Sequence, residues 1–160
     1  MPPIRLSVSV ISILAIAGLL LPVLARAHDY KLGALEIVQP WTRATPATAP
    51  SGGGFVTITN TGTTPDRLIA VRSAAADKTK IHEMKMEGNI MRMRELENGL
   101  EIAPGATVVL KPGGYHIMFM GLKAPFAKDA KVAATLVFEK AGSIDVELDV
   151  AAMGAGAPKH

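Results

Sequence analysis

Residues 82–120 read HEMKMEGNIMRMRELENGLEIAPGATVVLKPGGYHIMFM. This stretch holds six of the eight methionines of the chain and two of its four histidines: Met84, Met86, Met91, Met93, Met118, Met120, His82 and His116. Methionine is usually a sparse filler of irregular gaps in protein cores. Its concentration between two histidines therefore calls for a chemical explanation.

The first half of this stretch predicts a β-hairpin. Residues 80–86 and 90–96 are short alternating runs, and the turn-forming cluster Glu87-Gly88-Asn89 separates them. With Gly88 and Asn89 at the centre of the turn, the expected cross-strand pairs are Met86 with Met91, Met84 with Met93, and His82 with Glu95. Because side chains alternate along a strand, His82 and all four methionines of the hairpin share one face. A bulge or a longer loop would shift this register.

The second half supplies another strand. Residues 115–120 form an apolar run that follows the breaker Lys111-Pro112-Gly113-Gly114. In a strand, His116 and Met118 must face the same side. Two strand segments that each offer a His-x-Met triplet can close around one ion.

The donor types point to copper(I). Thioether sulfur is a soft, neutral ligand that selects copper(I), whereas zinc prefers thiolate, imidazole and carboxylate. The chain has no cysteine, which removes the thiolate that blue-copper electron-transfer centres and most structural zinc sites require. A single methionine is more often a core residue than a ligand, so the prediction depends on the joint pattern of the two triplets and Met93. Met86, Met91 and Met120 are expected in the core or at the rim, with ion capture as a second possibility.

The spacing of these residues resembles the signature of the PCuAC family of bacterial extracytoplasmic copper(I) chaperones. Ten residues separate His82 from Met93, 22 separate Met93 from His116, and His116-Ile117-Met118 completes the pattern. The second gap is one residue longer than the family pattern. The resemblance extends over residues 35–150 and includes VQPWTRA at 38–44, GFVTITN at 54–60 and LKPGGYH at 110–116.

This resemblance implies a cupredoxin-like Greek-key β-sandwich that binds one copper(I) through His82, Met93, His116 and Met118. It further implies a monomeric copper chaperone that passes the ion to a copper-accepting protein, toward assembly of the copper centre of a respiratory haem-copper oxidase. A periplasmic copper buffering or resistance protein would use the same site. A secreted interaction domain that binds no metal is the remaining alternative. Whether Met84 is also a ligand stays open.

The rest of the chain is also predicted to be all-β. Strands are expected at residues 35–39, 54–60, 67–73, 107–111, 131–139 and 144–151, which are rich in Val, Ile and Thr. With the hairpin and residues 115–120, this makes about nine strands at the spacing of a sandwich or barrel. Residues 44–54 (ATPATAPSGGG) are expected to form a long surface connection, or else a flap beside the metal. Trp41 is expected to be either a core anchor or a wall of the metal site.

The first 27 residues predict a secretory signal peptide. Arg5 precedes the apolar residues 6–21, and Pro22 stands before the cleavage motif Ala25-Arg26-Ala27. An uncleaved membrane anchor is the alternative. Cleavage would release the protein into the periplasm without a membrane contact. The remaining chain has 15 basic and 14 acidic residues, a balance that gives no reason to expect nucleic-acid binding.

The expected organisation after the signal is an N-terminal tail at residues 28–34, the copper-binding domain at 35–151 and a flexible tail at 152–160. A new N-terminus at His28 could chelate copper(II) as in an oxidase, but this segment reads as a frayed tail. Met153 and His160 could capture a second, weaker copper ion. No G-x-S-x-G, P-loop or dinucleotide-binding motif occurs, so no catalytic residue is assigned and the protein is not expected to be an enzyme.

Overall fold

The computed structural model describes residues 29–158, which form eleven β-strands. Their bounds are β1 Tyr30–Leu32, β2 Leu35–Arg43, β3 Ser51–Asn60, β4 Asp66–Arg72, β5 Ala76–Glu87, β6 Ile90–Glu95, β7 Leu100–Ile102, β8 Thr107–Leu110, β9 Tyr115–Leu122, β10 Lys131–Phe138 and β11 Gly142–Ala151. The predicted signal peptide, His28 and His160 lie outside the described residues. Within the described part of the chain, no helix is long and apolar enough to cross a membrane.

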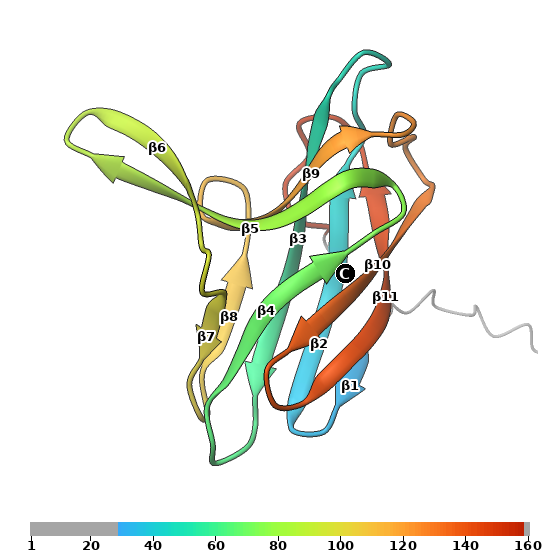
Figure 1. Cartoon of the computed structure of the whole chain (residues 1–160). Coiled ribbons are helices and arrows are strands. Elements are labelled where there is room, and N and C mark those ends of the chain that lie inside the picture. The colour runs from blue at the N-terminus through green and yellow to red at the C-terminus, as the bar shows by residue number, and fades with distance from the viewer. Residues whose placement is uncertain (1–28, 159–160) are drawn as a thin grey trace, which may run out of the picture.

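The strands form one mixed sheet in the order β6-β5-β9-β3-β2-β11-β10-β4-β7, with β1 added to β2 and β8 added to β3. All pairs are antiparallel except β11 with β2. Beyond β11, which pairs with β2, the sheet curls over so that β10 and β4 lie in front of β2 and β3 (Figure 1). The predicted all-β, cupredoxin-like architecture is confirmed.

The core lies between these layers because alternate side chains of each strand turn inward. On β5 and β9 the inward residues are Ile81, Ile117 and Phe119, all almost fully buried. Residues one position away, including His82 and His116, therefore face the other side of these two strands. The same alternation that fills the core thus gathers the candidate ligands on one surface.

Two short strands were missed in the sequence. β1 occupies residues 30–32 and pairs with Ile37, Glu36 and Leu35 of β2, so the prediction of a frayed tail is wrong there. β7 is only three residues long and pairs with Leu68 and its neighbours on β4. Runs of three residues are too short for a reliable alternation signal.

The connection expected at residues 44–54 is shorter than predicted, because β3 already begins at Ser51. Its three glycines lie within the strand. A Cβ atom on Gly54 would stand 2.8 Å from the Phe119 ring and 3.0 Å from Leu148, and a Cβ atom on Gly52 would stand 3.1 Å from the Phe126 ring. Because they have no side chain, the glycines allow β3 to pack closely against buried aromatic rings. They belong to a strand and not to a flexible loop.

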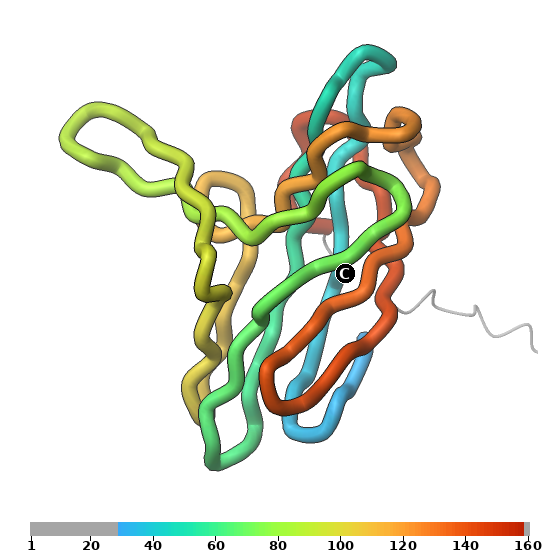
Figure 2. The backbone as a smooth tube through the Cα atoms, in the orientation of Figure 1, coloured from blue at the N-terminus to red at the C-terminus, as the bar shows by residue number. Residues whose placement is uncertain are grey.

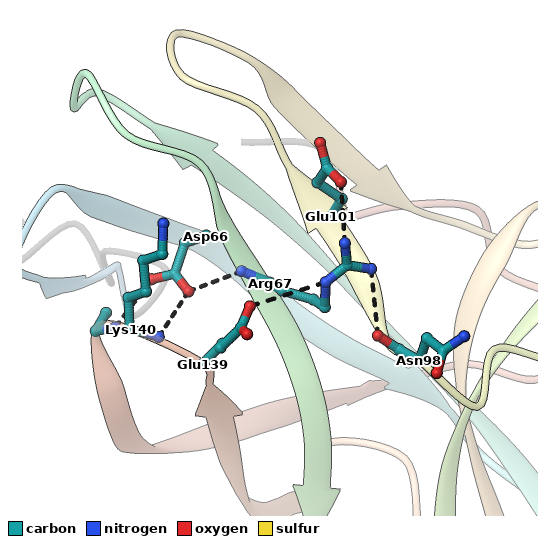
Figure 3. A network of polar contacts seen from close by, with 7 residues as sticks. Asp66, Arg67, Asn98, Glu101, Glu139 and Lys140 are labelled. Carbon is teal, nitrogen blue, oxygen red and sulfur yellow. Dashed lines mark hydrogen bonds and ion pairs between the residues drawn. The ribbon is translucent and has the colours of Figure 1, made fainter.

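A polar network fixes the end of the sandwich away from the hairpin (Figure 3). The buried carboxylate of Asp66 accepts backbone hydrogen bonds from Arg67 at 2.7 Å, Lys140 at 2.9 Å and Ala141 at 2.9 Å. The Arg67 guanidinium forms an ion pair with Glu101 at 3.0 Å and donates to the Asn98 carbonyl at 3.2 Å. Asp66 thus joins the β4 entry to the β10–β11 turn.

Candidate metal centre

The β5–β6 hairpin has the register that the sequence predicts. His82 pairs with Glu95, Met84 with Met93, and Met86 with Met91. Gly88 has a positive φ of 64° and Asn89 does not, which is the pattern of a type II′ turn. The outer part of the hairpin extends away from the sandwich as a two-stranded arm (Figures 1 and 2). His82 lies where the arm joins the sheet, because it still pairs with β9.

The two His-x-Met triplets lie side by side on neighbouring strands. β5 and β9 are antiparallel, and His82 is directly opposite His116. Their ring centroids are 5.7 Å apart and the rings are nearly perpendicular, at 73°. Because the strands run in opposite directions, Met84 and Met118 lie on opposite sides of this histidine pair. Met118 is itself opposite Lys80 on β5 and Gly53 on β3.

A surface cavity of about 270 Å³ collects most of the predicted donors. It is lined by Met84, Met93, His116 and Met118, together with Arg43, Thr45, Gly53, Phe55, Pro112 and Gly113. Of the four residues predicted as ligands, His82 is the one that does not line this cavity. Its ring instead contacts the ring of His116, which does line it. Met84, left open in the sequence, is a lining residue.

His116 is oriented by a backbone carbonyl. Its Nδ1 lies 3.0 Å from the Gly114 oxygen, which also accepts a hydrogen bond from the Met84 amide at 3.1 Å. With the Nδ1 proton donated to this carbonyl, the lone pair of the neutral ring is on Nε2. A metal-binding histidine is commonly held in this way by a hydrogen bond from its other nitrogen. Gly114 is a supporting residue that the ligand motif does not reveal.

His82 offers a buried nitrogen without a hydrogen-bond partner. Its Nδ1 is the only buried side-chain nitrogen or oxygen in residues 29–158 for which no partner is found. A buried polar atom left in this state costs free energy, unless a ligand completes its bonding. Burial, followed by the nearby charge of His116, lowers the pKa of His82 below its ordinary value of 6.5, while Glu95 opposes this shift. His82 is therefore kept neutral, the form that can bind a metal ion.

One aromatic side chain, Phe55, contributes to the cavity wall, and a second aromatic ring packs behind it. The Phe55 ring lines the cavity, and Trp41 packs behind it with a centroid distance of 4.6 Å. Trp41 is buried and does not line the cavity itself, so it supports the wall. A Cβ atom on Gly53 would stand 3.1 Å from the Phe55 ring, which shows that this glycine gives Phe55 its place. Neither Phe55 nor Gly53 was identified from the sequence.

Other regions of the described chain are poorer candidates. A hollow of about 740 Å³ is larger, but its lining contains neither methionine nor histidine. No group of three or more His, Cys, Asp or Glu side chains within residues 29–158 is arranged to hold a metal ion. The donor set in the β5–β6–β9 cavity is thus dominated by thioether and imidazole, which suits a soft monovalent ion better than a hard divalent one.

Comparison with known proteins agrees with this arrangement. Residues 35–150 match the model of the LpqE-like family, described as "Putative lipoprotein LpqE-like". The "Putative lipoprotein Lxx21020" of Leifsonia xyli subsp. xyli is 32% identical over 132 residues, which cover 81% of this chain and 77% of that protein. The word lipoprotein belongs to the names of that family and that relative.

Solved PCuAC domains have a similar structure. The copper-bound PCuAC domain from PmoF2 is 27% identical with a TM-score of 0.67, covering 78% of this chain and 98% of that domain. The apo PCuAC domain from PmoF1 gives the same identity and TM-score, over 78% of this chain and 99% of that one. DR1885 from Deinococcus radiodurans, solved with copper(I), shares the fold at 22% identity and a TM-score of 0.60, over 78% of this chain and 81% of that one.

The match over residues 35–150 and the similarity to solved PCuAC domains confirm the resemblance expected from the His-x10-Met and His-x-Met pattern. The chain belongs to the LpqE-like family, and its β-sandwich is a PCuAC domain.

Proposed function

We propose that this protein is an exported copper(I) chaperone that carries one ion in the β5–β6–β9 cavity. The observation that carries this proposal is the convergence of Met93, His116 and Met118 on one cavity, with His82 beside His116. The copper-bound PCuAC domain of PmoF2, 27% identical, supports it. In this proposal His82, Met93, His116 and Met118 are the ligands, and Met84 is a further donor within reach.

The site suits a cargo ion more than a catalytic one. Thioethers stay unprotonated at all ordinary pH values. Two thioethers and two neutral imidazoles add no charge of their own, so the loaded site carries only the single charge of copper(I), which costs less beside an apolar side chain such as Phe55 than the two charges of a divalent ion. Methionines Met84, Met93 and Met118 belong to three different strands, and each can be replaced separately by a ligand of an acceptor. Transfer then proceeds by exchange of one metal–ligand bond for another, with no change of oxidation state.

The acceptor is proposed to be a copper-accepting protein outside the cytoplasm, in the first instance a respiratory haem-copper oxidase subunit, in keeping with the PCuAC family. Copper buffering uses the same cavity but needs no acceptor. A transfer assay separates the two. The copper(I)-loaded protein is mixed with an excess of the apo copper domain of an oxidase subunit, and the two are separated and analysed for metal. Movement of most of the copper supports a chaperone, and retention at equilibrium contradicts it.

The proposed location is the periplasm, reached through the signal predicted at residues 1–27. A fusion of the full chain to a reporter that is active only after export tests this. Fractionation then separates a soluble periplasmic product from one that stays with the membrane, as an uncleaved anchor would require.

A further inference from the structure

We propose that Met86 and Met91, at the outer end of the β5–β6 arm, form a second soft-metal site from which copper(I) enters or leaves the cavity. The proposal adds a step to the copper-carrying function proposed above and rests on it. It concerns residues outside that cavity, since neither methionine lines it.

The first observation is position. Met86 and Met91 are direct cross-strand partners, one rung farther out than the pair Met84–Met93. The Cβ atoms of directly opposed residues in an antiparallel pair lie about 4.5–5.5 Å apart. Flexible methionine side chains at that separation can place both sulfur atoms on one ion. Copper(I) and silver(I) both accept coordination by two ligands. Both pairs lie on the face of the arm that also carries His82.

The second observation is exposure. Met86 is 53% exposed and Met91 is 47% exposed, so of the two places expected for them, core or rim, the core is excluded. Met93, between them and the cavity, is 48% exposed. Methionines this exposed do not contribute core packing, and an ordinary solvent-facing strand would carry polar residues at these positions. Their sulfur atoms are accessible to an ion or to a partner that carries one.

The third observation is the sorting of charge between the two faces of the arm. The opposite face holds Arg94 in an ion pair with Glu83 at 2.6 Å and Arg92 in an ion pair with Glu87 at 2.8 Å. The alternation of side chains along β6 places both guanidinium groups on the face opposite the methionines, where they do not repel a cation bound by sulfur. The arm thus presents neutral sulfur donors on one face, while Arg92, Arg94 and Lys85 lie on the other.

The geometry gives a path to the cavity. Neighbouring rungs on one face are two residues apart, about 7 Å along the strand. An ion held by Met86 and Met91 moves inward when the sulfur of Met93 forms a bond to it and one of the outer sulfur bonds breaks. The charge and the oxidation state stay the same. His116 and Met118 then replace the remaining outer bond, and export to an acceptor follows the reverse order.

Silver(I) titration of the full chain labelled with [methyl-13C]methionine tests the site, because silver(I) imitates copper(I) and does not oxidise. Single Met→Leu variants assign the methyl signals. The proposal predicts that Met93 and Met118 shift during the first equivalent, and that Met86 and Met91 shift during the second. Unchanged Met86 and Met91 signals through two equivalents would overturn it. If the Met93 and Met118 signals do not shift during the first equivalent, the result would instead contradict the proposed function.

Variants sharpen the test. Met86→Leu with Met91→Leu keeps the apolar volume and removes both sulfur atoms. In native mass spectrometry, this double variant should no longer bind a second equivalent of silver(I). Its affinity for the first equivalent should stay within about twofold of the wild type, since Leu and Met differ little in packing. Met153→Leu is the matched control, because Met153 is 63% exposed and lies beyond β11. Retention of the second equivalent in the double variant, or its loss in the control, refutes the assignment to Met86 and Met91. The single variant Met91→Leu should weaken the second equivalent without any effect on folding.

Discussion

His82 on β5 and His116 on β9 are direct cross-strand partners, and their rings meet edge to face with centroids 5.7 Å apart. This pairing brings together two residues that are 34 positions apart in the sequence, and it determines where the methionines stand. Met84 and Met93 lie on one side of the histidine pair and Met118 on the other. An ion at His116 therefore has sulfur donors on both sides.

Loss of one thioether should weaken copper(I) binding without unfolding the protein. Met118→Leu removes a donor that lines the cavity, and we expect the copper(I) dissociation constant to rise on the order of tenfold or more, about 1.4 kcal/mol. Competition with a chromophoric copper(I) chelator measures it. Met120→Leu is the matched control, two residues along β9 on the same face but outside the cavity lining. Equal effects of the two variants would mean that Met118 has only a packing role.

Copper(I) affinity should fall as the pH is lowered, because a proton competes for imidazole. Two unperturbed histidine ligands would make the fall begin near pH 6.5. Burial and the charge of His116 lower the pKa of His82. Protons therefore compete with copper(I) for His82 only at pH values farther below 6.5. In the metal-free protein, His82 of the unfolded chain is protonated at a higher pH than His82 of the folded chain, because folding lowers its pKa. The free energy of unfolding should therefore decrease as the pH falls through 6.5 toward the lower folded-state pKa.

Affinity measured by chelator competition from pH 7.5 to 5 tests this. His82→Met supplies a donor that does not protonate in this range, so the decrease in affinity at the acid end of the range should become less steep. A wild-type affinity that stays flat over the whole range would show that neither histidine binds the ion.

A single methyl group added at Gly53 should lower both the stability of the protein and its copper(I) affinity. Gly53→Ala places a Cβ atom 3.1 Å from the Phe55 ring, so the ring must move within the cavity wall. Overpacking of this kind costs about 1–3 kcal/mol of folding free energy, and the displaced ring should also lower copper(I) affinity. Gly156→Ala is the control, since a Cβ atom there meets nothing within 4 Å. Thermal denaturation and chelator competition on both variants give the two readouts. An unchanged affinity in Gly53→Ala would mean that Phe55 does not shape the site.

The Asp66 network should affect stability alone. Asp66→Ala leaves the backbone amides of Arg67, Lys140 and Ala141 without their acceptor. Each hydrogen bond to a charged group contributes about 1.5–3 kcal/mol, so urea denaturation should show a loss of at least this size when all three are removed. Copper(I) affinity at a temperature where the variant is folded should match the wild type. A large loss of affinity there would show that the two ends of the sandwich are coupled.

The sequence was most informative where the interactions are local. A tight turn at Gly88-Asn89 fixes the register of its hairpin, so the pairs Met84–Met93 and Met86–Met91 followed from the turn position alone. The strands expected at 107–111 and 131–139 from alternation and turn residues also formed, each ending one residue earlier, as Thr107–Leu110 and Lys131–Phe138.

What the sequence could not give is mostly non-local. The pairing of β5 with β9 depends on the packing of the whole sheet, so the direct contact of His82 with His116 had no local signal. Gly53 looked like part of a flexible loop, because a glycine that makes room for an aromatic ring has the same appearance in a sequence as one in a loop. The sequence could not decide between the core and the rim for Met86 and Met91, because methionine is normally a buried residue.

X-ray absorption spectroscopy of the protein loaded with one equivalent of copper(I) tests the central claim most directly. The account predicts a mixed shell of nitrogen and sulfur scatterers at the metal. In the double variant Met93→Leu with Met118→Leu, the sulfur contribution should shrink relative to nitrogen. A shell of nitrogen and oxygen alone in the wild-type protein would contradict the account, as would failure of the protein to take up one equivalent.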